Sequence, residues 1–388
     1  MRATDSPSRS SVALSTAGNA GVGVVVSYAP QDGFNPESHE CVTRMQIAEQ
    51  LAALKGYEFG GEYDQTARYP EALYYVPSRT LLGSEGARLG IRDEDDLFGG
   101  VVPYPFVGTK TITHPLPYGN AHTPEGWCSH FAAAVEDAVL GGHAAFTLED
   151  AERAGAKLLE RGCVRVKPAL ALGGRGQVVV RAISELGAAV REIDAIELVS
   201  CGVVLEQNLE EVKTYSVGQV RVAKLIATYV GTQSLTTDNQ GAQVYGGSDL
   251  IVARGDFEAL LALDLGCESR RVVQQARIYD RAAHEHFPGF FASRRNYDIA
   301  HGRDSNGRAC CGVLEQSWRL GGASSAEVAA LEVFRADAEA QVVRVRCVEV
   351  YGHCERPPPE ARVYFCGADE KVGFITKFTI VEPHADTR

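Results

Sequence analysis

Residues 166–177 read Val-Lys-Pro-Ala-Leu-Ala-Leu-Gly-Gly-Arg-Gly-Gln. An apolar strand delivers Lys167, and a glycine-rich loop follows it. The loop residues are Gly173, Gly174, Arg175 and Gly176. Glycines let backbone N–H groups approach a phosphate closely, because no Cβ stands in the way, and the two basic side chains add the charge that phosphate attracts. The segment predicts a phosphate-binding loop; the alternative is a plain glycine hairpin with an exposed lysine and arginine.

A second segment, residues 312–324, reads Gly-Val-Leu-Glu-Gln-Ser-Trp-Arg-Leu-Gly-Gly-Ala-Ser. Its Glu315 ends an apolar strand, and Asp298 lies in the strand expected before it. A turn at Asp304-Ser305-Asn306-Gly307 joins two such strands as an antiparallel pair and can bring both carboxylates to one place. Magnesium in nucleotide sites takes one or two carboxylates together with phosphate oxygens and water. The segment predicts a magnesium site; the alternative is a structural ion pair between Glu315 and Arg319.

A third segment, residues 203–209, lies between these two and reads Val-Val-Leu-Glu-Gln-Asn-Leu. The apolar strand runs out at Glu206, and an irregular stretch follows. Such a strand end can present backbone N–H and C=O groups to the edge of an adenine ring, although any boundary between strand and loop has this pattern. In this order the three segments predict a single site for a magnesium nucleotide.

The composition narrows the class of protein. With 388 residues, 45% hydrophobic and 23% charged, the chain suits a globular protein of two or three packed units. The net charge of -12 argues against nucleic acid and anionic membranes as partners. No run of about 18 apolar residues predicts a transmembrane helix. Residues 1–20 lack the pattern of a secretory signal, so we expect a disordered tail on a cytoplasmic protein.

The cysteines and histidines give weaker signals. The ten cysteines include no Cys-x-x-Cys pair, so buried free thiols are expected. A late metal site is the alternative, formed by Cys347, His353, Cys354 and Cys366. His114 and His301 are candidates for acid–base groups, although a single histidine is more often structural.

Hydrophobic periodicity and capping signals predict the elements. Predicted helices cover about residues 36–54, 124–139, from the Thr147 cap to 159, 256–263, 268–286, and from a Ser324/Glu327 capping box onward. Predicted strands cover about residues 21–28, 71–77, 164–166, 178–182, 196–205, 215–223, 226–229, 295–300, 309–315, 342–350, 361–366 and 372–381.

Over residues 100–340 this order resembles the ATP-grasp superfamily of carboxylate–amine and carboxylate–thiol ligases, which includes biotin carboxylase and D-alanine–D-alanine ligase. Gly173 to Gly176 is similar to the glycine loop of biotin carboxylase. The stretch from Glu315 to Gly322 is similar to the E-x-N-x-R-x-G-G stretch of the superfamily. The whole chain also resembles a bacterial ATP-grasp-like family that is catalogued as a domain of unknown function.

The resemblance implies an α+β protein with an ATP-grasp fold, in which two α/β subdomains sandwich ATP. A small α/β domain would precede it, and C-terminal strands would follow. The expected units are a disordered tail 1–20, an N-terminal α/β domain 21–120, a small ATP-grasp subdomain 121–210, a large subdomain 211–340 and a C-terminal β-strand extension 341–388.

The resemblance also implies roles for individual residues. ATP would be bound by Lys110, Lys167, Gly173, Gly174, Arg175, Gly176, Glu206, Gln207 and Leu209. Magnesium would be held by Asp298, Glu315 and Ser317, and the catalytic residues would be Arg175 and Arg319. Ser317 departs from the superfamily, which has a metal-binding asparagine there, although a hydroxyl can still ligate magnesium or a bridging water. Thr214 stands where a ribose-binding acid is usual, so Glu210 or Glu211 would replace it.

The implied function is an ATP- and Mg²⁺-dependent ligase. It would activate a small-molecule carboxylate as an acyl phosphate for attack by an amine or a similar nucleophile. Ser317 motivates an alternative, a non-catalytic ATP-binding sensor or assembly protein. A third interpretation is a scaffold that forms a homodimer through its C-terminal strands.

Overall fold

The computed structural model describes residues 23–30, 35–69, 72–171, 173, 175–352 and 356–382. The tail expected over residues 1–20, Gly174, and the pair His353 and Cys354 lie outside this part of the chain. The helices are α1 His39–Lys55, α2 Gly83–Leu89, α3 Ser129–Ala134, α4 Leu148–Leu159, α5 Ile183–Arg191, α6 Ala195–Ser200, α7 Phe257–Leu261, α8 Cys267–His286 and α9 Ser324–Ala336. None of these helices combines the length and the apolar composition that a membrane span requires, within the described ranges.

The strands form four sheets. Two small sheets near the N-terminus contain β1 Val24–Tyr28, β2 Glu58–Glu62, β3 Leu73–Pro77, β4 Leu81–Leu82, β5 Gly100–Val102 and β13 Phe291–Ala292. A four-stranded sheet contains β6 Gly142–Ala145, β7 Val164–Pro168, β8 Val178–Val180 and β9 Val203–Gln207. The largest sheet contains β10 Glu210–Val222, β11 Leu225–Thr237, β12 Gln243–Arg254, β14 Arg294–Arg303, β15 Ala309–Ser317, β16 Val342–Tyr351, β17 Arg362–Asp369 and β18 Gly373–Val381.

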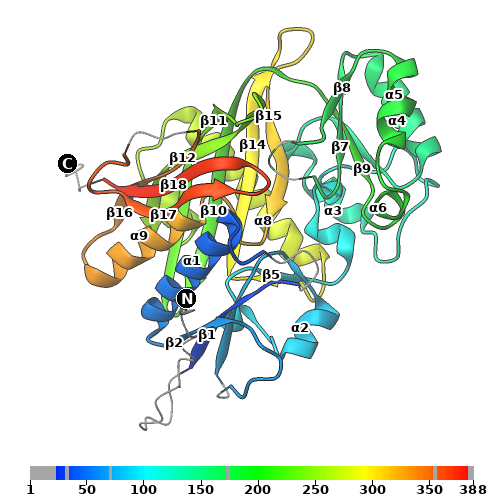
Figure 1. Ribbon diagram of the computed structural model, residues 1–388. Coiled ribbons are helices and arrows are strands. Elements are labelled where there is room, and N and C mark those ends of the chain that lie inside the picture. The colour runs from blue at the N-terminus through cyan, green and yellow to red at the C-terminus, as the bar shows by residue number, and fades with distance from the viewer. Residues whose placement is uncertain are drawn as a thin grey trace, which may run out of the picture.

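The eight strands of the largest sheet follow the order β15-β14-β10-β11-β12-β16-β18-β17, and neighbouring strands are antiparallel (Figure 1). The three strands predicted after residue 340 are confirmed. They continue the same sheet that carries β14 and β15 and form its opposite edge.

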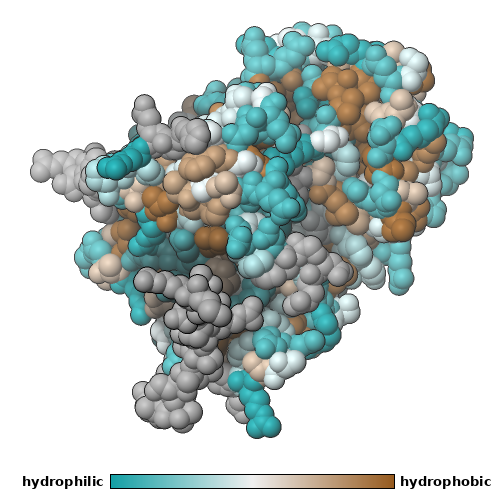
Figure 2. Space-filling model, in the orientation of Figure 1, coloured by the Kyte–Doolittle hydropathy of each residue, from teal (hydrophilic) through white to brown (hydrophobic). Residues whose placement is uncertain are grey.

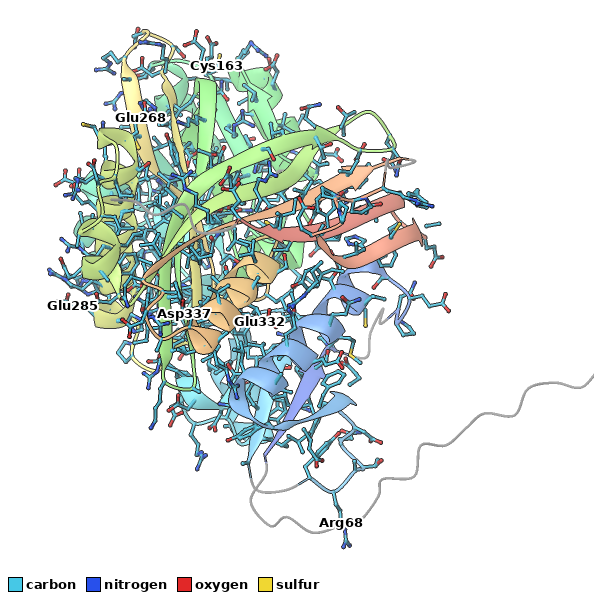
Figure 3. The ribbon with its side chains drawn as sticks, turned by 90° about the vertical axis from the view of Figure 1, so that its left-hand side faces the viewer. Arg68, Cys163, Glu268, Glu285, Glu332 and Asp337 are labelled. Atoms are coloured by element: carbon cyan, nitrogen blue, oxygen red, sulfur yellow. The ribbon has the colours of Figure 1, made fainter. Side chains whose placement is uncertain are left out.

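Helices cover both faces of this sheet. Successive side chains of a strand point to opposite faces, so one strand contributes apolar residues to both layers of the core. Tyr215, Val217 and Tyr297 pack with α8 on one face. Val220 and Val222 pack with α1 and α9 on the other. Figure 3 shows this layering, with Glu268 and Glu285 marking α8 and Glu332 marking α9.

The four-stranded sheet has the order β6-β9-β7-β8, and α4 and α5 share its apolar core. It lies next to β15 of the largest sheet (Figure 1): an isolated parallel bridge joins Val139 to Val313, and β15 contacts a 3₁₀ helix, Lys110–Thr113. Figure 2 shows hydrophobic surface over β8, α5 and α6. Its exposed residues are Leu170, Val178, Ile183, Ile196 and Val199.

The N-terminal strand–helix–strand unit is confirmed as β1, α1 and β3, with β1 and β3 parallel. The sequence prediction missed β2, which begins at Glu58 after the left-handed Gly56 ends α1 and which pairs with the other side of β1. The β2 sequence Glu-Phe-Gly-Gly-Glu has little β propensity of its own, so its pairing depends on tertiary contact.

Two predicted elements between residues 120 and 210 are wrong. The helix predicted over residues 124–139 is reduced to α3 and a 3₁₀ turn, because Gly126 has a left-handed φ of 83° and Val135 leaves the helical geometry. The strand predicted over residues 196–205 begins only after Gly202, and its first half is α6. The Asp194 carboxylate caps α6 by accepting from the N–H groups of Ile196 and Glu197.

The two predicted capping boxes have different outcomes. Thr147 caps α4 by accepting from the N–H of Asp150, as predicted, but the Asp150 carboxylate accepts from the Tyr118 hydroxyl and from the N–H of His122 instead of completing the box. The box at Ser324 is wrong: Ser324 is the first residue of α9 and its hydroxyl accepts from the N–H of Gly321. Glu327 is fully buried and forms an ion pair with Arg294, so a tertiary partner has taken the side chain that the motif assigned to the backbone.

Candidate nucleotide site

Asp298 and Glu315 face each other across β14 and β15, as the sequence predicts. Their register depends on a β-bulge: Ile299 pairs with Val313 and Asp298 with Glu315, so Leu314 is an extra residue in β15. Val313 packs in the core under α8. Without the bulge, Leu314 would face Asp298, and Glu315 would point into that core. The bulge therefore delivers the second carboxylate.

The two carboxylates destabilise each other in the ionised form. Burial, followed by the charge of Glu315, raises the pKa of Asp298 to about 6. Gln233 and Asn296 donate hydrogen bonds to Asp298 Oδ1 at 2.7 and 2.9 Å, and these act in the opposite direction. A divalent cation would relieve this repulsion, so the pair fits magnesium. In the described residues no third histidine, cysteine or acidic residue completes a metal cluster, so the remaining oxygens would come from phosphate and water.

Ser317, expected as a metal ligand from the superfamily pattern, lies beside a buried guanidinium. Arg294 Nη1 donates to Ser317 Oγ at 3.2 Å and to the carbonyl oxygen of Ser317 at 3.0 Å. The guanidinium is 1% exposed and is held by Glu327, which is fully buried. A fixed positive charge beside the hydroxyl repels a second cation. We therefore expect Asp298 and Glu315 to be the main ligands of a cation, and the role of Ser317 stays a prediction.

Lys110 connects the carboxylates to the four-stranded sheet. Its Nζ lies 2.9 Å from Glu315 Oε2 and donates to the carbonyl oxygen of Ala171 at 2.6 Å, and the side chain is 3% exposed. Its contact with Pro168 O is longer, at 3.5 Å. The Thr109 side chain caps the 3₁₀ helix that begins at Lys110. The earlier basic residue expected at the site is thus brought to the carboxylates by tertiary folding.

A second buried lysine lies on the neighbouring sheet. Lys167 Nζ is 2.5 Å from Glu206 Oε1, and His114 Nε2 is 2.9 Å from Glu206 Oε2. All three side chains are almost completely buried. Burial alone would raise the pKa of Glu206, but Lys167 and His114 outweigh it and lower that pKa. His114, noted in the sequence only as a single histidine, is therefore part of this cluster.

The residues expected near adenine are partly engaged. Both carboxylate oxygens of Glu206 have partners, so its side chain is not turned toward a ligand. The N–H of Gln207 donates to Gly141 O, and Leu209 packs with Leu140. The N–H of Asn208 donates to the carbonyl oxygen of Cys163, so the backbone N–H groups of residues 207 and 208 also have partners. Of the two acids considered for ribose, Glu211 forms an ion pair with Arg303.

The glycine loop connects β7 to β8. Gly173 and Gly176 have φ values of 61° and 67°, which favour glycine because a Cβ is strained there. Arg175 is exposed and forms no ion pair with the described residues. This arrangement leaves its guanidinium able to meet an anion.

Arg319 follows β15, the strand that carries Glu315, and is half-buried. Burial, followed by the charge of Arg294, lowers its pKa, whereas Glu315 and Glu40 act in the opposite direction. Its Nη1 donates to the carbonyl oxygen of Leu320 at 2.8 Å. The guanidinium therefore lies within the field of the carboxylate pair and of the first turn of α1.

The residues that the sequence interpretation missed are buried polar partners. They are Arg294, Glu327, Tyr229, Asn296 and Gln233. Tyr229 donates to Glu327 at 2.5 Å, and this network supports the loop after Ser317. Glu327 carries only the capping-box pattern, which assigned its side chain to the backbone, and no local motif marks the other four residues.

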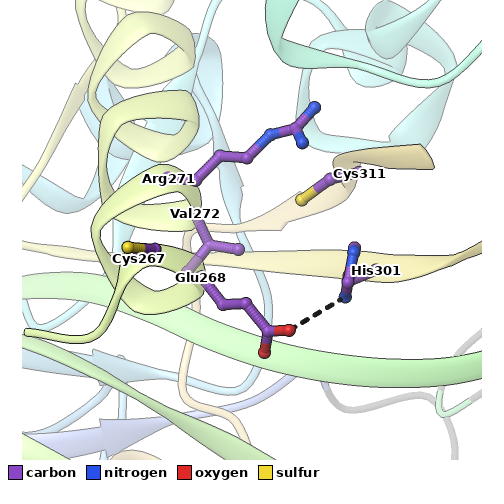
Figure 4. Close-up of a pocket in the computed structure, with 6 residues that line it drawn as sticks. All are labelled: Cys267, Glu268, Arg271, Val272, His301 and Cys311. Atoms are coloured by element: carbon purple, nitrogen blue, oxygen red, sulfur yellow. Dashed lines mark ion pairs between the residues drawn. The ribbon is translucent and has the colours of Figure 1, made fainter. Parts of the chain in front are cut away.

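A cavity of about 170 Å³ lies between α8 and the strands β14 and β15 (Figure 4). Its lining residues are Cys267, Glu268, Arg271, Val272, His301 and Cys311. His301 Nδ1 lies 3.7 Å from Glu268, which also accepts from Tyr215 at 2.6 Å. The cavity shares no residue with the proposed nucleotide site, so His301 has no geometric link to that chemistry.

Comparison with known proteins gives both a family and similar folds. Biotin carboxylase from Campylobacter jejuni is 11% identical, with a TM-score of 0.49 over 92% of this chain and 87% of that one. D-alanine–D-alanine ligase from Bacillus anthracis is 11% identical, with a TM-score of 0.46 over 80% and 96%. N5-carboxyaminoimidazole synthase from Aspergillus clavatus is 10% identical, with a TM-score of 0.49 over 93% and 94%. No curated protein matches the sequence.

The first two of these enzymes are the ATP-grasp members to which the sequence resemblance refers. The model of one protein family matches residues 27–379, which is most of the chain. The protein therefore belongs to the family described as "Protein of unknown function (DUF3182)".

Proposed function

We propose that the protein is an ATP- and Mg²⁺-dependent ligase that activates a carboxylate as an acyl phosphate for attack by an amine. The observation that carries this proposal is the paired register of Asp298 and Glu315, with the ammonium of Lys110 2.9 Å from Glu315. Phosphoryl transfer requires acids that hold a cation and basic groups close to the phosphates. Here the two acids would hold the cation, and the lysine lies between them and the strand that leads to the glycine loop. The resemblance of residues 100–340 to ATP-grasp ligases supports the same reaction class.

In this proposal the protein acts mainly by positioning and charge. Asp298 and Glu315 would hold magnesium, which offsets the charge of the phosphate oxygens when it is bound. Lys110, Lys167 and Arg175 would meet the phosphates. Arg319 would face the acyl phosphate, because it lies within the field of Glu315 and follows it on the same segment.

The acceptor substrate would lie on the side of Arg319 that faces α1. Glu40 in the first turn of α1 acts on the pKa values of both Arg319 and His39. Next to His39, Lys377 Nζ on β18 lies 2.8 Å from Glu349 on β16. These groups join the N-terminal unit and the C-terminal strands at one polar surface beside the site. If this surface binds the acceptor, Lys377→Met lowers turnover without weakening ATP binding.

Calorimetric titration with ATP and magnesium tests the proposal. The wild type should bind ATP only with the metal present. Glu315→Gln should weaken the metal-dependent part, because it removes one of two ligand charges, whereas Lys224→Met at an exposed turn should change nothing. Absence of ATP binding at millimolar nucleotide would rule the proposal out.

A non-catalytic ATP-binding protein is the second candidate, and the contact between Arg294 and Ser317 favours it. A buried guanidinium where a further metal ligand was expected leaves fewer oxygens for magnesium. The two candidates differ in ADP release. Tight ATP binding without ADP release across a broad panel of acids and amines would support the sensor, whereas release with one pair would support the ligase.

A further inference from the structure

Lys110 makes contacts to two separate parts of the molecule. On one side its ammonium meets Glu315 of β15 at 2.9 Å. On the other side it donates to Ala171 O at 2.6 Å and lies 3.5 Å from Pro168 O. Pro168 and Ala171 bound the segment that leads from β7 to the glycine loop, which we call the loop stem, residues 168–171. One buried ammonium thus contacts both the loop stem and β15, the strand that carries Glu315.

We propose that Lys110 is a cation-responsive latch between the loop stem and the carboxylate pair. In the metal-free protein its ammonium supplies the positive charge that Glu315 needs. A divalent cation at Asp298 and Glu315 displaces it, and the freed ammonium meets the phosphates. This inference rests on the proposed function and adds an order of events to it: the metal releases the loop stem.

The electrostatics of the described groups support this exchange. Glu315 is the only carboxylate within ion-pair distance of Lys110 among the described residues, so losing that contact removes its counter-charge. A divalent ion and an ammonium on the same carboxylate repel each other strongly in a partly buried site. The two backbone carbonyls are neutral and cannot compensate a displaced charge.

The geometry also separates Lys110 from Lys167. The ammonium of Lys167 is held by Glu206 on the adjacent strand of the same sheet, so its pair joins β7 to β9 and bridges no two units. Lys110 belongs to a segment that contacts β15, and its partners lie on both sides of the proposed site. Lys110, unlike Lys167, therefore has contacts that can report the occupancy of β15 to the loop stem.

Manganese binding without nucleotide tests the latch. Lys110→Met removes the competing ammonium, so it should bind Mn²⁺ roughly tenfold tighter than the wild type, measured by electron paramagnetic resonance or calorimetry. Lys110→Arg keeps the charge and should bind like the wild type, and Lys224→Met is the control for loss of a surface lysine. A lysine that only contacts phosphate predicts no change in any variant.

Hydrogen exchange of the loop stem gives the second measurement. Mn²⁺ alone should speed amide exchange at residues 169–171 in the wild type by several fold. In Lys110→Met exchange should already be fast and unaffected by Mn²⁺, and Glu315→Gln should show the same pattern. Unchanged Mn²⁺ affinity in Lys110→Met, or a loop stem that does not respond to the ion, would overturn the latch.

The same samples separate this proposal from the proposed function. A wild type that binds ATP with magnesium, combined with unchanged Mn²⁺ affinity in Lys110→Met, keeps the nucleotide site and removes the latch. A wild type that binds neither Mn²⁺ nor ATP removes both. If Lys110→Met does not fold, Lys110→Gln, which removes the charge and keeps a polar side chain, takes its place: tighter Mn²⁺ binding than in the wild type decides for the latch, and an unchanged affinity decides against it.

Discussion

Asp298 lies directly opposite Glu315 on neighbouring antiparallel strands, and the extra residue Leu314 sets that register. The pair costs stability as long as both groups are ionised, since burial and mutual repulsion raise the pKa of Asp298 to about 6. Natural proteins retain such repulsion mostly at functional sites. The relationship leads to the first prediction.

Asp298→Asn should stabilise the metal-free protein above pH 6. Because its folded pKa lies above the unfolded value, Asp298 contributes stability when protonated at low pH, and this is lost as the pH rises from about 4 through about 6. The loss approaches about 3 kcal/mol. Urea unfolding of both proteins from pH 4 to pH 8 measures it, and parallel curves would contradict the assignment. Magnesium should raise the melting temperature of the wild type but not of Asp298→Asn.

Ser317→Ala should leave divalent cation binding unchanged, because the hydroxyl accepts from Arg294 rather than facing an ion. The stability cost should be about 1 kcal/mol, the net value of one hydrogen bond. Glu315→Gln is the matched variant on the same strand and should weaken Mn²⁺ binding strongly. A loss of Mn²⁺ affinity in Ser317→Ala equal to that in Glu315→Gln would restore Ser317 as a ligand.

Removal of one partner from the buried Arg294–Glu327 pair should be severe. Arg294 Nη2 lies 2.7 Å from Glu327 Oε1, and both side chains are almost fully buried. Glu327→Leu leaves an unpaired guanidinium and should cost about 3–5 kcal/mol in the free energy of unfolding. Adding Arg294→Met should recover much of that loss, because the orphan charge disappears. A double variant as unstable as the sum of the single variants would show that no such coupling exists.

Lys167→Met should destabilise the protein most at high pH. In the wild type Lys167 and His114 lower the pKa of Glu206, so the cluster contributes stability above the unfolded pKa of the carboxyl and loses it as the pH falls. In the variant Glu206 remains buried but has lost its main partner. The loss in the free energy of unfolding should approach about 3–5 kcal/mol near pH 8. Toward pH 4 the carboxyl can be protonated, so the difference from the wild type should shrink. A constant difference over this range would argue against the buried pair.

The sequence alone indicated the strands that carry the site, because their signals are local. The apolar run before Lys167, the glycines after it, and the turn ending in Gly307 are short-range patterns, and the structure has β7, β14 and β15 at these places. The glycine positions also follow from backbone sterics, as the left-handed Gly173 and Gly176 show. Local patterns failed where a cap was overlooked, as at Asp194 before α6.

Tertiary structure decided which charges meet. Lys110 reaches Glu315 and Arg294 reaches Glu327 across long stretches of chain, and no spacing rule links such residues. Burial makes an unpaired charge costly, so a buried charge is found beside a partner in the folded protein. The same packing places Arg294 next to Ser317. The sequence determined which groups could bind a nucleotide and a cation. Only tertiary packing determined that Lys110 meets Glu315, because the hairpin of β14 and β15 by itself places Asp298 opposite Glu315 but no local pattern brings a distant lysine to them.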